Sequence, residues 1–286
     1  MTRPLASPSL PEPLPAAPAE PDPGALARIG MRVQASAHEA LTTASFLGEV
    51  LLATARLLRG KSGMRWVDLL RQLDQTGPLS LPIVTLTCAL VGLMLAYMGG
   101  AQLDKMGAQL FIADIVTVGM VREVAGLMTG MILAGRIGAA FAAQLATMQA
   151  GEEIDALRVL GVNPIDHLVI PRLLALVLVA PLIMAYAAAV GVLAGALPAS
   201  AVYGVPVSEY LQRCVLAMKW SHLWIGVFKC TLYAALLSLA GCREGLHAGR
   251  DAQAVGLATT SGVVKGLVWI IAAACATTVA LQSMGF

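Results

Sequence analysis

Long stretches without any charged side chain alternate with short charged segments along most of this chain. Residues 79–103 and residues 173–208 contain no Asp, Glu, Lys or Arg. Uncharged apolar runs of about 18 residues or more are typical of membrane-spanning helices. The pattern predicts spans at about 79–100, within 111–148, and at about 173–197, 221–241 and 263–283. The expected fold is therefore an all-α integral membrane protein with about five transmembrane helices.

The first 76 residues follow a different pattern. Residues 1–24 hold eight of the fifteen prolines and no apolar core, which predicts a disordered, Pro-rich tail. Residues 25–76 have apolar positions at helical spacing, but charged residues interrupt every possible span. We expect an amphipathic helical region that lies in the membrane interface; a soluble helical domain is the alternative. Residues 77–286 then form the membrane domain.

Composition excludes several classes of function. Hydrophobic residues make up 58% of the chain and charged residues 13%, whereas a soluble domain is about half apolar and about a quarter charged. The net charge of +2 and the absence of a basic block argue against a nucleic-acid partner. Lys61-Ser62 after Gly60 resembles the end of a phosphate-binding loop, but Ala55 occupies the position of its first glycine. No metal-ligand spacing and no catalytic constellation is present, so we expect a transport or scaffold protein that is not an enzyme.

The distribution of Lys and Arg near the span ends predicts the orientation. With the N-terminus in the cytoplasm, ten of these residues lie inside and four outside. Cytoplasmic loops carry the excess of positive charge in membrane proteins. Five spans then place the C-terminus on the outer side. If residues 111–148 formed two spans instead of one, the C-terminus would lie on the inner side.

A few charged residues fall within or beside the predicted spans. Arg136 and Lys229 sit inside apolar stretches, and intramembrane charge marks a functional site by default. Alternatively, each lies near an interface and extends its head group to water. Arg122 and Glu123 are adjacent near the outer end of the second span. Adjacent residues on a helix do not face each other, so we expect each to pair with another element.

The segment 149–172 connects two spans and has its own helical pattern. Acidic residues that complement a helix dipole open it, at Glu152, Glu153 and Asp155. Apolar residues follow at Ile154, Leu157 and Leu160. Gly161 and Asn163-Pro164 are expected to end the helix. A short helix with one acidic and one apolar face suits contact with a partner protein.

The same segment resembles the MlaE/YrbE family of ABC-transporter permeases. The motifs that carry the resemblance are Glu152 to Leu157, Leu160 to Pro164, Pro171-Arg172, Arg122-Glu123 and Ala134 to Gly138. The resemblance covers about residues 65–286. Two positions depart from the family pattern: no proline follows Arg122-Glu123, and Gln144 stands where an acid is common.

The resemblance implies the permease subunit of an ATP-driven transporter that moves phospholipid or a related lipid across or out of the bacterial inner membrane. The implied partners are a second copy of the chain, a cytoplasmic ABC ATPase that binds ATP and Mg, a periplasmic Mce-domain protein, and lipid. This chain itself would bind no cofactor. The implied ATPase-coupling helix comprises Glu152, Glu153, Ile154, Asp155, Leu157, Arg158, Leu160, Gly161, Asn163 and Pro164. We expect lipid contacts near Leu93, Tyr97 and Met98.

Two other functions remain open at this point. A secondary transporter would need no ATPase, but such proteins usually show internal repeats and paired broken helices, and neither is visible. A membrane scaffold that transports nothing is the other alternative.

Overall fold

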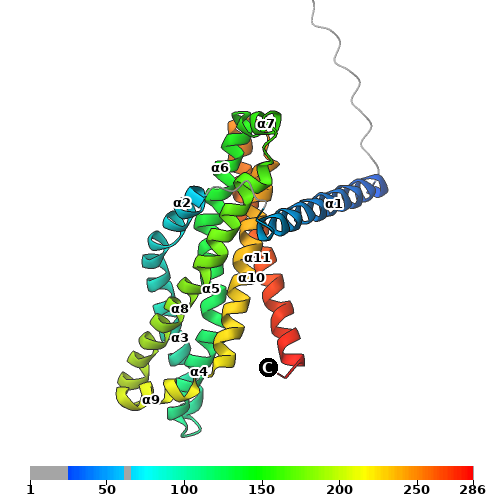
Figure 1. Ribbon diagram of the computed structural model, residues 1–286. Coiled ribbons are helices and arrows are strands. Elements are labelled where there is room, and N and C mark those ends of the chain that lie inside the picture. The colour runs from blue at the N-terminus through cyan, green and yellow to red at the C-terminus, as the bar shows by residue number, and fades with distance from the viewer. Residues whose placement is uncertain (1–24, 61–65, 286) are drawn as a thin grey trace, which may run out of the picture. The chain divides into compact units, whose positions relative to one another are not determined.

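The computed structural model describes residues 25–60 and 66–285, and every regular element within them is helical (Figure 1). The α-helices are α1 (Ala25–Leu58), α2 (Trp66–Thr76), α3 (Leu81–Asp104), α4 (Ile112–Gly119), α5 (Ala125–Leu133), α6 (Ala139–Ala150), α7 (Glu153–Val159), α8 (Ile170–Ala201), α9 (Val207–Ala217), α10 (Trp220–Leu246) and α11 (Ala252–Ser283). Two short 3-10 helices, η1 (Pro78–Ser80) and η2 (Gln109–Phe111), and three π-helical segments, η3 (Met120–Val124), η4 (Ala134–Gly138) and η5 (Ile165–Val169), complete the set. The all-α prediction is confirmed, whereas the predicted disordered tail 1–24 lies outside the described residues.

The chain divides into two compact units, residues 1–44 and residues 45–286. In the first unit, the described residues form the first part of α1. The second unit contains the last turns of α1, where Phe46, Val50 and Ala53 are buried, together with α2 to α11. The boundaries expected after residues 24 and 76 depend on changes in amino-acid composition, whereas this division depends on contacts between residues. The two divisions therefore describe different properties of the chain.

Five helices among the described residues are long and apolar enough to cross a membrane. They are Ala37–Leu58, Trp66–Asp104, Ile165–Ala201, Trp220–Leu246 and Ala252–Ser283. Four of them contain spans expected from the sequence, at 79–100, 173–197, 221–241 and 263–283. The remaining helix, Ala37–Leu58, falls in the region expected to lie in the interface. The expectation that charged residues interrupt every possible span in this region is wrong, because this helix is long and apolar enough to cross a membrane, while its actual position relative to the membrane stays a prediction.

The span expected within 111–148 belongs to a helix that runs without a break from Ile112 to Ala150, which we call the central helix. It is about 58 Å long at the usual rise of about 1.5 Å per residue, well beyond the hydrocarbon core of about 30 Å. The segments η3 and η4 interrupt its α-helical geometry where Arg122, Glu123 and Arg136 occur. Single π-helical turns inside α-helices are frequent at functional sites.

The central helix packs against α8, α10 and α11, and α3 packs along α8. Figure 1 shows α7 at one end of this bundle and α9 at the opposite end. Glycines allow the closest approaches: a Cβ on Gly92 would lie 2.0 Å from the carbonyl oxygen of Gly191, and one on Gly226 would lie 2.2 Å from that of Val121. Small residues at such crossings let helices in lipid form close van der Waals contacts.

Candidate functional site

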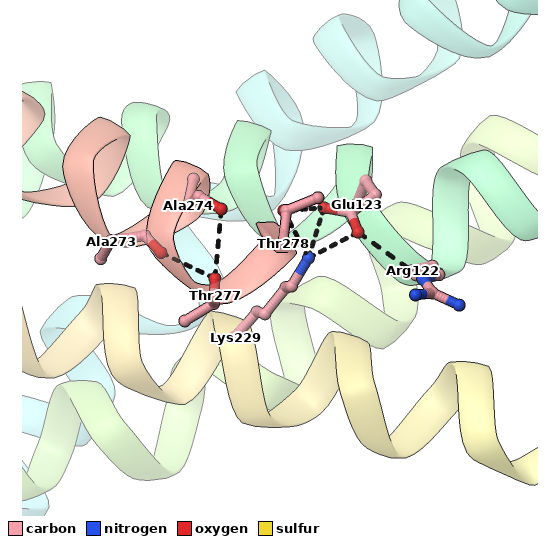
Figure 2. A network of polar contacts seen from close by, with 7 residues as sticks. All are labelled: Arg122, Glu123, Lys229, Ala273, Ala274, Thr277 and Thr278. Carbon is pink, nitrogen blue, oxygen red and sulfur yellow. Dashed lines mark hydrogen bonds and ion pairs between the residues drawn. The ribbon is translucent and has the colours of Figure 1, made fainter. Parts of the chain in front are cut away.

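A buried ion pair joins three helices in the interior of the bundle (Figure 2). The Nζ atom of Lys229 on α10 donates to both carboxylate oxygens of Glu123 on η3, at 2.5 and 2.6 Å, and to Oγ1 of Thr278 on α11 at 2.9 Å. The Thr278 hydroxyl donates in turn to Oε2 of Glu123 at 3.2 Å. We call Glu123, Lys229 and Thr278 the polar triad.

The polar triad satisfies the lysine completely. An ammonium group has three donors, and each of them has an acceptor here. Lys229 is 1% exposed, whereas the Glu123 side chain is 37% exposed. Burial of a charge is tolerable when it is paired and hydrogen-bonded, so the carboxylate on the central helix is what makes a lysine possible on α10.

Arg122 also lies beside Glu123, with its Nε atom 3.6 Å from Oε1 (Figure 2). The expectation that Glu123 pairs with another element therefore agrees with its bond to Lys229, but the two adjacent residues also approach each other. The sequence left two interpretations of Lys229 open, a functional charge within a span or a charge near an interface that extends its head group to water. Its burial contradicts the second interpretation, because it is enclosed by protein and paired with Glu123.

Arg136 occupies a separate position from the polar triad. Its Nη1 atom donates to the Ser80 hydroxyl at 2.5 Å, and that hydroxyl donates to the carbonyl oxygen of Thr76 at 2.9 Å. Ser80 and Thr76 are buried where α2 leads through η1 into α3. Arg136 thus connects the second π-helical segment of the central helix with the start of α3.

The predicted coupling helix is α7, which lies between the central helix and α8. It begins after Glu152, whose φ of 59° is left-handed, and ends in a Schellman motif. In that motif the N–H of Gly161 bonds to the carbonyl of Arg158, and the N–H of Val162 bonds to that of Leu157. Gly161 ends the helix as predicted, since its φ of +76° suits glycine.

The apolar residues of α7 do not form one outward face. Ile154 is fully buried and Leu157 is partly buried against the core, whereas Leu160 is 76% exposed and Val159 is also exposed. Ile154 and Leu157 are three positions apart and share the inward side of the helix. Leu160 is its C-cap, whose N–H still bonds to the carbonyl oxygen of Ala156, and helical spacing places it about 120° around the axis from Ile154. The expected partner surface of Ile154, Leu157 and Leu160 is therefore divided between the interior and the exterior.

The acidic residues of α7 are partly engaged within the chain. Arg250, in the loop between α10 and α11, donates to Asp155 at 2.8 Å and to Glu152 at 3.4 Å. Arg158 lies 3.1 Å from Asp155, while Glu153 is exposed. Past the helix, the side chain of Asn163 accepts the N–H of Ile165 at 2.9 Å, and Pro164 precedes η5. These contacts fix the orientation of α7 on the bundle.

The sequence profile of the MlaE permease matches residues 69–280. The chain belongs to the MlaE permease family. It is 35% identical over 226 residues to the Arabidopsis thaliana protein named "TRIGALACTOSYLDIACYLGLYCEROL 1, chloroplastic", which covers 79% of this chain and 63% of that protein. It is 32% identical over 234 residues to a "Probable ABC transporter permease protein" of Synechocystis, covering 80% and 86% of the two chains. A protein of that name from Rickettsia typhi is 32% identical over 203 residues, which cover 71% of this chain and 78% of that protein.

The surface of the permease carries the residues expected to contact lipid. Tyr97 and Met98 on α3 are exposed and Leu93 is half-buried. A separate apolar cavity of about 560 Å³ lies among the central helix, α8, α9 and α10, with Val121, Val192 and Leu223 in its wall. The sequence pattern did not indicate this cavity, because its walls come from four distant segments.

The described part of the permease offers ion-pairing, hydrogen-bonding and apolar contacts. Burial raises the pKa of the Cys214 thiol in the wall of the apolar cavity, so this thiol stays uncharged. Within residues 25–60 and 66–285, no three His, Cys, Asp or Glu side chains gather in a way that could hold a metal ion. The polar triad can hold three helices together, and the apolar surfaces can accept hydrocarbon.

Proposed function

We propose that this permease is the membrane subunit of an ATP-driven ABC transporter that moves phospholipid or a related lipid across or out of the bacterial inner membrane. Its membership of the MlaE permease family and the relatives named as ABC transporter permeases support the transporter class. The name of the Arabidopsis relative contains that of a lipid, trigalactosyldiacylglycerol. Because the match spans 63% of that relative, the lipid in its name is a guide to the class of substrate only.

The observation that carries the proposal is the rigid placement of α7. A force that arises outside the membrane must enter through a stiff element, because a floppy loop would absorb the motion. The buried Ile154, the Schellman motif and the Arg250 contacts fix α7 between two long helices. Its exposed end, with Val159 and Leu160, offers an apolar anchor for a partner. The ATPase would bind there, together with its own ATP and Mg.

Lipid suits this chain better than a polar solute. The charges in the middle of the spans, Lys229 and Glu123 of the polar triad, are already engaged with each other. The outward-facing side chains of the spans include large exposed apolar ones, on α3 near Tyr97 and Met98 and on α11 near Val264 and Val268. Such surfaces accept acyl chains and provide few hydrogen bonds for a sugar or an amino acid.

The remaining parts of the proposal concern assembly. A homodimer would place an apolar cavity between two copies, and a periplasmic Mce-domain protein would exchange lipid with it. The excess of Lys and Arg on the inner side supports an N-terminus in the cytoplasm and a C-terminus in the periplasm. These assignments rest on family membership and on the positive-inside rule.

Purification of the full chain from its native membrane tests the proposal. We expect an ABC ATPase to copurify with the chain, and we expect solvent extraction of the purified complex to yield bound lipid. Added lipid should also stimulate ATP hydrolysis by the complex. Leu160→Asp should abolish copurification of the ATPase, because a charge replaces the apolar anchor. The matched control is Leu216→Asp on α9, an equally exposed leucine at the opposite end of the bundle.

The alternatives make different predictions in the same experiment. A secondary transporter would bring no ATPase but would still move its solute, and a scaffold would do neither. Wild-type recovery of the ATPase with Leu160→Asp would reject α7 as the coupling element.

A further inference from the structure

A polar cavity of about 310 Å³ lies where α2 meets the ends of the central helix and α8. Side chains from four elements line it: Asp68, Arg71 and Gln72 from α2, Gln144 from α6, His167 from η5 and Arg172 from α8. None of them belongs to the polar triad, to α7 or to the apolar cavity. The function proposed above leaves this cavity without a role.

Arg172 is the charge that distinguishes the cavity, because it is only 7% exposed. Its Nη1 atom donates to the carbonyl oxygen of Leu168 at 2.7 Å, and Nη2 donates to Oε1 of Gln144 at 3.3 Å. The guanidinium carbon lies 5.8 Å from the centre of the Phe141 ring. All three partners are electrically neutral, so none of them compensates the positive charge.

One donor of the Arg172 guanidinium has no acceptor, and its positive charge has no ion-pair partner among the described residues. Its Nε atom is buried and has no partner, and the ion pairs formed by the described residues do not include Arg172. A buried guanidinium normally has a carboxylate or phosphate that matches its planar set of donors. An unsatisfied buried polar atom in a native structure calls for such an explanation.

The other side chains of the cavity indicate the chemical type of ligand that would pair with Arg172. Arg71 adds a second positive charge at the rim, and the amide groups of Gln72 and Gln144 can each donate. The buried Oε1 atom of Gln72 also has no partner. The oxygen and nitrogen of an amide are hard to tell apart and can be exchanged by rotation. Rotation of the Gln72 amide would place its NH₂ donor where the oxygen now lies.

Two arginines and the amides of Gln72, Gln75 and Gln144 offer more donors than a carboxylate has lone pairs to use, and they suit the several oxygens of a phosphate group. Asp68 is the one acidic side chain in the cavity, and it can accept a hydrogen bond from a hydroxyl or ammonium group of the same ligand. We propose that this cavity is a binding site for a phosphate group, with Arg172 as its main ligand and Arg71 at its entrance.

The phosphate could belong to a lipid head group or to a small soluble molecule, and the experiment separates the two. The full chain, purified alone in detergent, is titrated with inorganic phosphate at constant ionic strength by calorimetry. In parallel, its thermal stability is measured in mixed micelles that contain phosphatidic acid or, as the phosphate-free control, diacylglycerol. A ligand that binds only the folded chain raises its melting temperature.

The decisive variant is Gln144→Glu, which places a carboxylate where an oxygen already lies 3.3 Å from Nη2 of Arg172. The new internal ion pair should weaken phosphate binding by about tenfold or more while leaving the fold intact. Arg71→Gln should weaken binding by several-fold, since an exposed arginine at the rim contributes less. Gln282→Glu, the same change at the exposed end of α11, should leave binding within about twofold of wild type.

Binding of inorganic phosphate that Gln144→Glu removes supports a soluble ligand. Stabilisation by phosphatidic acid alone, also removed by Gln144→Glu, supports a lipid head group. The inference is overturned if neither source binds, if diacylglycerol stabilises as much as phosphatidic acid, or if Gln144→Glu binds like wild type. No ATPase is present in this assay, so its outcome is independent of the function proposed above.

Discussion

Replacing Glu123 by Gln should destabilise the permease more than replacing Lys229 by Met. Glu123→Gln leaves an ammonium group that is 1% exposed without its counter-charge. Only neutral acceptors, the new amide oxygen and the Thr278 hydroxyl, would remain near it. Breaking a buried ion pair in this direction costs about 3–5 kcal/mol. We expect the lower end of that range, because the remaining acceptors still bond to Nζ.

The reverse change, Lys229→Met, should cost less. It removes the buried charge itself and leaves a carboxylate that is 37% exposed, with Nε of Arg122 only 3.6 Å away. The loss is then that of hydrogen bonds to a charged group, about 1.5–3 kcal/mol. The apolar methionine fills most of the lysine volume, which reduces the loss further.

The double variant Glu123→Gln with Lys229→Met measures the pair directly. It should be more stable than Glu123→Gln alone, because replacement of both partners removes the uncompensated charge. The assay is the melting temperature of the full chain in detergent. A loss of about 3 kcal/mol corresponds to a decrease of roughly 6–12 °C for a chain of this size. The control is Glu152→Gln, which removes an exposed ion pair with Arg250 on the surface and should cost about 1 kcal/mol or less.

The reasoning is refuted if the two single variants lower the melting temperature equally and their effects add in the double variant. That result would mean that the carboxylate does not compensate the lysine, and that each side chain contributes only its own contacts.

Three further predictions concern helix contacts and the surface. Ile154→Ala should lower stability by about 2–5 kcal/mol, while Leu160→Ala should leave the melting temperature within about 1 °C, as surface changes usually do; equal effects would contradict the division of the α7 residues. Gly92→Val should separate α3 from α8 at Gly191 and reduce the yield of folded protein in detergent, whereas Gly256→Val, where the space is open, should not. A photo-crosslinking residue at Tyr97 should capture lipid in an active complex, and consistent failure to do so would count against lipid contact there.

Much of this architecture could be predicted because it depends on local pattern. Runs without charge, such as 79–103 and 173–208, indicated helices that the structure places at these positions. The end of α7 at Gly161 followed from the conformational freedom of glycine, which the structure uses in the Schellman motif. In each case neighbouring residues along the chain contain the necessary information.

Residues that function through distant partners were predicted less well. Glu123 and Arg136 stood out as charges in apolar surroundings, but their partners did not. Lys229 lies 106 positions beyond Glu123, and a lysine in an apolar stretch is equally compatible with a position at an interface. Ile154 was expected to face a partner, because helical spacing defines a face without saying which way that face points.

The sequence by itself determined that the chain is helical, where its long helices run, where α7 ends, and which family it belongs to, since periodicity, charge and motif spacing are properties of contiguous residues. Only the tertiary structure decided that Glu123 neutralises Lys229, that Ile154 points inward, and that Arg172 lines a polar cavity without forming an ion pair with a described residue. The physical reason is the short range of these interactions. A salt bridge or a hydrogen bond acts over about 3–4 Å, and segments far apart along the chain reach such distances only after the helices have packed.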